Sequence, residues 1–183
     1  MEFYENSQSP ERALLIGVDT GEYNAEISME ELALLSETAG AEIIGTVIQK
    51  LEAPSPATYI GSGRMSEVAA FCRNNDIDLI IADSELTPSQ INNIETKTDT
   101  RVVDRTMLIL DIFAARARSS EGKLQVELAQ LEYMLPRLRG WGGSLSRQAG
   151  GRAAGDAGIG SRGPGETKIE MDRRVIRSRI AKL

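Results

Sequence analysis

Short runs of apolar and β-branched residues recur through the first hundred positions, and each run is separated from the next by a stretch with helical spacing. The runs span residues 12–18, 42–48, 77–82 and 101–104. Runs of this length without alternation are typical of strands buried on both faces of a sheet. Because strands alternate with helices, we predict an α/β fold with a small, mainly parallel four-stranded sheet flanked by helices.

Helix signals fill the intervals between these runs. A capping-box pattern that begins at Ser28 predicts a helix that ends before Gly40, where glycine stands in the usual terminating position. A second helix is expected over residues 65–74. Thr87 followed by Pro88 predicts the start of a third helix, with a hydroxyl cap and proline at the first helical position.

From residue 122 onward the apolar positions step by four and three residues. The stripe comprises Leu124, Leu128, Leu131, Leu135 and Leu138. This spacing predicts an uninterrupted helical arm from Gly122 to Leu138, about 25 Å long, whose apolar seam needs a partner. Pro136 predicts a bend in it. A matching stripe of Ile169, Ile176, Ile180 and Leu183 predicts that the last segment folds back as the second arm of a long antiparallel helical hairpin.

These elements divide the chain into three parts. We expect residues 1–10 to form a disordered N-terminus, residues 11–117 the α/β domain, and residues 118–183 the helical hairpin. The hairpin has a Gly/Arg-rich tip at about residues 139–166, which holds ten of the chain's 17 glycines. A loop of this length without apolar periodicity is either a linker or a functional element.

Charge is divided unevenly along the chain. Residues 1–136 hold 10 Lys or Arg against 23 Asp or Glu, whereas residues 137–183 hold 11 against 4. The overall net charge of -6 conceals this division. A basic segment after an acidic domain is typical of an appendage that binds nucleic acid. A solvated, charge-balanced helix pair is the alternative interpretation.

The residue inventory limits the chemistry that this stretch of protein can perform. The chain has no histidine, and its one cysteine, Cys72, lies on the apolar side of an expected helix. A catalytic triad, an ordinary zinc site and an internal disulfide are therefore excluded. The Gly-x4-Gly-Lys-Ser/Thr phosphate loop is absent from the sequence. We expect no catalytic residue, no metal site and no cofactor here.

The sequence also predicts a cytoplasmic protein. No apolar run approaches the roughly 18 residues needed to span a bilayer, and residues 1–10 are polar and acidic rather than signal-like.

Basic and aromatic residues in and near the tip are suited to RNA. Arginine forks pair with phosphates, and guanidinium planes and indole rings stack on unpaired bases. A flexible linker, the alternative interpretation of the tip, needs neither residue type. For Arg173 and Arg174, ordinary ion pairs on a helix surface are a further alternative. The predicted RNA-binding residues are Arg137, Arg139, Trp141, Arg147, Arg152, Arg162, Lys168, Arg173 and Arg174.

Two other hypotheses stay open. Gly61, Ser62, Gly63 and Arg64 lie where a loop enters an expected helix, and helix N-termini attract anions, so this turn is a candidate site for a nucleotide phosphate. A tight strand-to-helix connection requires the same pattern. Alternatively, the leucine seam pairs two chains and the hairpin mediates protein interaction, although we expect a monomer.

Several motifs together resemble the HflX-type ribosome-associated GTPases. They are Asp104-Arg105-Thr106, residues 112–117 (IFAARA), residues 125–131 (QVELAQL) and residues 162–167 (RGPGET). Residues 86–90 (LTPSQ) and 59–63 (YIGSG) also fit, with Arg64 where the family usually has lysine. The resemblance extends over nearly the whole chain.

This resemblance implies a place and a role for the chain. In the family, an N-terminal α/β domain and a helical hairpin precede a GTP-binding domain, and the protein binds the large ribosomal subunit and separates stalled or hibernating ribosomes. We therefore expect an N-terminal region that docks on the large subunit and its rRNA, acts in ribosome splitting, rescue or biogenesis, and contacts its own C-terminal GTPase domain. It is not expected to be an enzyme by itself, because GTP and Mg²⁺ belong to that further domain. A second purine-nucleotide activity is suspected for the family's N-terminal part, and only the Gly61–Arg64 turn is a candidate for it.

Overall fold

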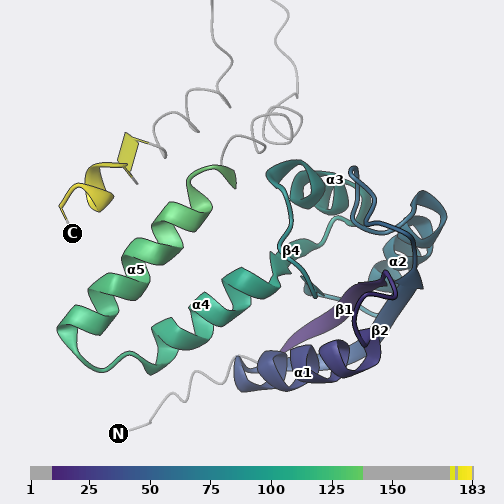
Figure 1. The fold of residues 1–183 in the computed structure, drawn as a ribbon, viewed down its shortest axis with the longest axis horizontal. Helices are drawn as coiled ribbons and strands as arrows, with labels where there is room; N and C mark the ends of the chain where they lie inside the picture. The colour runs from purple at the N-terminus through teal and green to yellow at the C-terminus, as the bar shows by residue number, and fades with distance from the viewer. Residues whose placement is uncertain (1–9, 138–173, 176, 183) are drawn as a thin grey trace, which may run out of the picture.

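The computed structural model describes residues 10–137, 174–175 and 177–182, and Figure 1 shows their arrangement. Strands and helices alternate through the first part of the chain, as the apolar runs predict. The elements are β1 (Glu11–Asp19), α1 (Ala25–Thr38), β2 (Ala41–Lys50), α2 (Ser62–Asn74), β3 (Leu79–Ala82), α3 (Pro88–Thr98), β4 (Arg101–Asp104), α4 (Arg105–Arg116) and α5 (Ser120–Met134).

The four strands form one parallel sheet in the order β2-β1-β3-β4. This order places β1 in the interior, where residues 13–16 are at most 1% exposed. β2 lies at an edge and its side chains are only half-buried or exposed. The α/β class with a four-stranded, mainly parallel sheet and flanking helices is confirmed.

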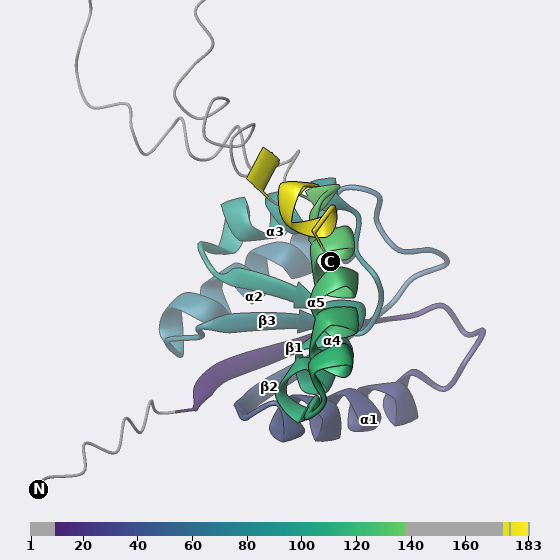
Figure 2. The same ribbon diagram turned by 90° about the vertical axis from the view of Figure 1, so that its left-hand side faces the viewer.

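Helices cover both faces of the sheet. On one face, α2 and α3 pack apolar side chains such as Met65, Val68 and Ile94 against the strands. On the other face, α1 and α4 contribute Met29, Leu32 and Leu108. Figure 2 shows α1 on the opposite side of the strands from α2 and α3. The sheet is therefore the middle layer of three, and its continuous apolar strands follow from burial on both faces.

The limits of α1 correct one expectation and bear out another. The helix begins at Ala25, because Asn24 caps it by accepting a hydrogen bond from the Ile27 backbone N–H at 3.1 Å. The predicted start at Ser28 is therefore wrong. The Ser28 hydroxyl instead accepts a hydrogen bond from the Arg105 guanidinium at 3.0 Å. The helix ends as predicted before Gly40, whose φ of +92° suits glycine.

The arm after the α/β domain is shorter than the predicted helix over residues 122–138. α5 begins after Ser119, whose hydroxyl accepts from the backbone N–H of Gly122 at 3.0 Å, and ends at Met134. The end falls two residues before Pro136, which cannot continue a helix without losing a hydrogen bond.

The long antiparallel hairpin is not confirmed. Within the ranges that the structure describes, the neighbour of α5 is α4, which packs along it (Figure 1). The C-terminal residues contact α5 through an ion pair between Arg179 and Glu127. Of the predicted second stripe, only Ile180 lies among the described residues, and it is half-buried.

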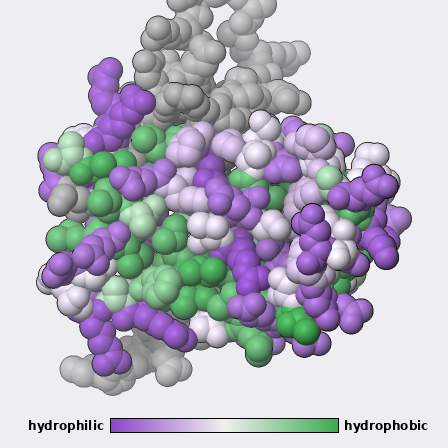
Figure 3. All heavy atoms as spheres, in the orientation of Figure 1, coloured by the Kyte–Doolittle hydropathy of each residue, from purple (hydrophilic) through white to green (hydrophobic). Residues whose placement is uncertain are grey.

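Part of the leucine stripe faces solvent. Leu124 on α5 and Phe113 on α4 are 46% and 58% exposed, and no residue of α5 is fully buried. Figure 3 shows apolar side chains gathered over the α4 and α5 side of the molecule. In the part of the chain that the structure describes, no helix is both long and apolar enough to cross a membrane.

Candidate functional site

The structure places two of the predicted RNA-binding residues, Arg137 and Arg174. The other predicted residues, Arg139, Trp141, Arg147, Arg152, Arg162, Lys168 and Arg173, lie outside the described ranges, so their predicted role stays a prediction.

Arg137 is turned inward against the α/β domain. Its guanidinium donates to the carbonyl of Leu86 and to Asp104 Oδ2, each at 3.1 Å, and lies 3.3 Å from the centre of the Tyr133 ring. Only 15% of the side chain is exposed. The guanidinium is used within the protein, so this geometry does not support the predicted contact of Arg137 with RNA. Arg137 turns inward because the buried carboxylate of Asp104, far away in the sequence, attracts its guanidinium.

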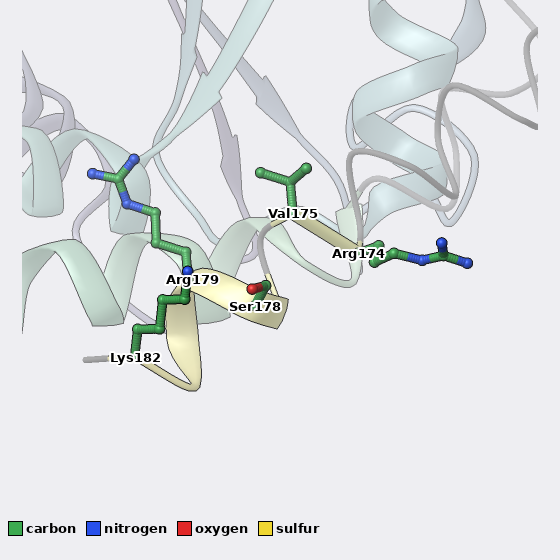
Figure 4. A pocket seen from close by; sticks show the side chains of 5 residues that line it. All are labelled: Arg174, Val175, Ser178, Arg179 and Lys182. Atoms are coloured by element: carbon green, nitrogen blue, oxygen red, sulfur yellow. The ribbon is translucent and has the colours of Figure 1, made fainter.

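Arg174 lies on an exposed basic segment at the C-terminal end. Residues 174–182 contain four Lys or Arg and no acidic residue. Arg174, Val175, Ser178, Arg179 and Lys182 line a shallow hollow there, and in Figure 4 the side chains of Arg174 and Arg179 extend away from each other. The side chains of Arg174 and Arg179 point apart, and Arg179 is paired with Glu127. The positive charge is therefore distributed along the segment and does not form a single anion-binding site.

The Gly61–Arg64 turn forms the start of α2, with Gly61 as its N-cap. The Gly61 backbone N–H donates to Gln49 Oε1 at 2.8 Å, and the Arg64 guanidinium pairs with Glu67 at 2.6 Å. Two of the groups that would hold a phosphate therefore already have partners in the protein. The turn serves the strand-to-helix connection, and nucleotide binding there stays a prediction.

The carboxyl ends of β1 and β3 are joined by Tyr59, which sequence reasoning passed over. Tyr59 is 2% exposed and has a φ of +67°, which is rare for a residue other than glycine. Its hydroxyl accepts from the Val18 backbone N–H and donates to Ser84 Oγ, both at 3.2 Å. Burial raises the pKa of Tyr59, so the hydroxyl keeps its proton at neutral pH.

A buried ion pair lies beside Tyr59 at the same edge. Asp83 follows β3 with 2% of its side chain exposed, and its Oδ1 is 2.7 Å from Nη1 of Arg105 at the start of α4. The other terminal nitrogen of Arg105 is 2.7 Å from Glu31 on α1. Open α/β sheets bind ligands at this edge. Here the polar side chains satisfy one another and connect α1, β3 and α4.

Known proteins show what this fold is similar to. Two family models match consecutive parts of the chain. The model described as "GTP-binding GTPase N-terminal" matches residues 26–114, and the model described as "GTP-binding GTPase Middle Region" matches residues 116–183. The boundary between them falls at the end of α4.

Curated relatives carry the name GTPase HflX. The relative from Caldanaerobacter subterraneus subsp. tengcongensis is 52% identical over 176 residues, which are 96% of this chain and 39% of the relative. The chain belongs to the HflX-type GTPase family. The Escherichia coli member is 40% identical over 181 residues, which are 98% of this chain and 41% of the relative. The chain thus spans about two-fifths of the length of these curated relatives.

Solved structures share the fold over a similar share of their own length. A crystal structure described as SsGBP in a complex with GDP superposes with a TM-score of 0.62 at 25% identity, over 94% of this chain and 41% of that chain. A GTP-binding protein from the hyperthermophilic archaeon Sulfolobus solfataricus, solved with GDP, gives a TM-score of 0.57 at 21% identity and supports the fold alone.

Proposed function

We propose that this region of the HflX-type protein docks on the RNA of the large ribosomal subunit through the basic part of the chain after the α/β domain. The observation that carries the proposal is the charge division: 10 cationic against 23 acidic residues up to position 136, and 11 against 4 afterwards. Phosphate contacts dominate the affinity of proteins for nucleic acid, and the acidic domain would be repelled by phosphate.

The described geometry guides which cations we include in this proposal. Arg137 is held inside the protein, so we leave it out of the RNA-binding set. Arg174 lies on the exposed segment and stays in it. Arginine side chains can pair with phosphates, and guanidinium and indole planes can stack on unpaired bases. On this ground the remaining members of the set are Arg139, Trp141, Arg147, Arg152, Arg162, Lys168 and Arg173.

For the whole protein we propose the activity that the family name indicates. GTP, with Mg²⁺, would bind and be hydrolysed in a domain outside residues 1–183, since these residues lack the phosphate loop. The region described here would position that domain on the large subunit during ribosome splitting, rescue or biogenesis in the cytoplasm.

Replacing three tip arginines tests the docking proposal. The variant Arg147→Ala, Arg152→Ala, Arg162→Ala should bind purified large subunits more weakly in cosedimentation. It should also reduce the slope of log affinity against log salt by roughly 2 to 3, because each lost phosphate contact removes somewhat less than one unit.

The matched control replaces three cations of the α/β domain. Arg73, Lys97 and Arg116 are exposed, each in the last turn of its helix, and their replacement by alanine changes the net charge equally. Helix content by circular dichroism verifies that both variants fold. Equal losses of binding in the two variants would mean that net charge, rather than the tip, governs the interaction.

A further inference from the structure

A buried polar cluster joins the end of α5 to the α/β domain. Its centre is Asp104, the last residue of β4, which is 1% exposed. Its outer members are Tyr133, in the last turn of α5, and Arg137, three residues after the helix ends. The loop after β3 contributes Leu86.

The two oxygens of Asp104 have different partners. Oδ1 accepts from the backbone N–H of Met107 at 3.0 Å and so caps α4. Oδ2 accepts from the Leu86 backbone N–H at 3.1 Å, from the Tyr133 hydroxyl at 2.5 Å and from Arg137 at 3.1 Å. A helix cap needs only the first oxygen. The second oxygen gathers donors from two further segments of the chain, which helix capping does not explain.

Arg137 closes the cluster from the other side. One terminal nitrogen donates to the backbone carbonyl of Tyr133 at 2.7 Å, and the other donates to the carbonyl of Leu86. The guanidinium stacks on the Tyr133 ring. Arginine's planar fork allows it to bind a carboxylate and carbonyls together while stacking on an aromatic face. Burial, helped by the nearby Asp104, raises the pKa of Tyr133, so its hydroxyl stays a donor.

We propose that Asp104, Tyr133 and Arg137 form a latch that fixes the end of α5 on the α/β domain. The need for such a latch follows from the rest of α5, which has no fully buried residue and, among the described elements, packs mainly on α4. A helix with so little burial opens easily unless its ends are held. The latch holds α5 in a fixed position relative to the sheet.

Hydrogen–deuterium exchange of the full chain tests the latch without any ribosome. Tyr133→Phe keeps the ring under Arg137 and removes the hydroxyl, and Arg137→Met removes the guanidinium. In both variants the backbone amide protons within residues 130–137 should exchange at least ~10-fold faster than in the wild type. This corresponds to a free energy of local opening that is lower by roughly 1.4 kcal/mol. The amides of α2, on the far side of the sheet, should keep their wild-type rates.

The variant Asp104→Asn distinguishes the role of Asp104 in the latch from its role as the cap of α4. Asparagine can still cap α4 with its oxygen, but its amide nitrogen is a donor that faces three donors. This variant should also free residues 130–137. Tyr23→Phe is the matched control, because the Tyr23 hydroxyl also donates one hydrogen bond, to the Val18 carbonyl at 2.8 Å, away from α5.

Three outcomes would overturn the latch. The first is an unprotected last turn of α5 in the wild-type chain. The second is exchange of residues 130–137 within twofold of wild type in both Tyr133→Phe and Arg137→Met. The third is a uniform rise across the whole chain, which would reveal a loss of global stability. The result is independent of ribosome binding, so failure of the docking proposal and failure of the latch are distinguishable.

Discussion

Replacing Arg105 by alanine should destabilise the fold far more than replacing a comparable surface arginine. Arg105 joins α4 to β3 and α1 through Asp83, whose side chain is 2% exposed, and Glu31, whose side chain is 61% exposed. Removing one partner of a buried pair costs about 3–5 kcal/mol, because it leaves an uncompensated buried charge. The exposed pair with Glu31 adds at most ~1 kcal/mol. Most of the cost therefore arises at Asp83.

Urea denaturation followed by circular dichroism measures this cost. With an m-value of about 2 kcal/mol per molar, the midpoint should fall by about 1.5–2.5 M. The matched control is Arg101→Ala, which breaks a 2.8 Å pair with Glu11 in which both side chains are 56% exposed, and which should cost at most ~1 kcal/mol. The double variant Arg105→Ala, Asp83→Asn should recover part of the loss, because no unpaired charge then remains. Equal midpoints for the two single arginine variants would mean that the pair with buried Asp83 stabilises the fold no more than an exposed pair does.

Three further predictions concern local structure. Asn24→Ala removes the cap of α1 and should cost about 1 kcal/mol, which lowers the melting temperature by roughly 2–4 °C in calorimetry. Gly40→Ala should destabilise the fold by about 1–2 kcal/mol, because the φ of Gly40 is +92°. Gly63→Ala should be neutral or stabilising, because a Cβ added at Gly63 meets nothing within 4 Å. A lower melting temperature for Gly63→Ala than for Gly40→Ala would contradict this. Burial raises the pKa of Glu95, so its contribution to stability is present below the ordinary value of 4.5 and is lost as pH rises through the folded-state value. Glu95→Gln keeps an acceptor for the Val102 backbone N–H and should flatten the fall in stability as pH rises above 4.5. An unchanged profile would exclude Glu95 as its cause.

The sequence predicts the sheet well because each strand carries its own signal. The apolar run at residues 12–18 is continuous because β1 lies in the interior of the sheet with helices on both faces. The glycine at position 40 predicts a helix end from local geometry alone. Such features depend on neighbours in sequence, so a pattern reveals them.

Features that depend on distant partners were missed. Ser28 has the pattern of a helix cap, but its hydroxyl accepts from Arg105, and Asn24 caps the helix four residues earlier. Arg137 has the pattern of a surface cation, but Asp104 lies 33 positions away and draws it inward. Spacing along the chain does not reveal pairs at such separations.

Cosedimentation of this chain with purified large ribosomal subunits across a salt series tests the docking proposal most directly. The chain should bind, and its log affinity should fall linearly with log salt, since the cations after position 136 would release counterions from RNA phosphates. Binding that is absent at low salt, or that does not change with salt, would contradict it.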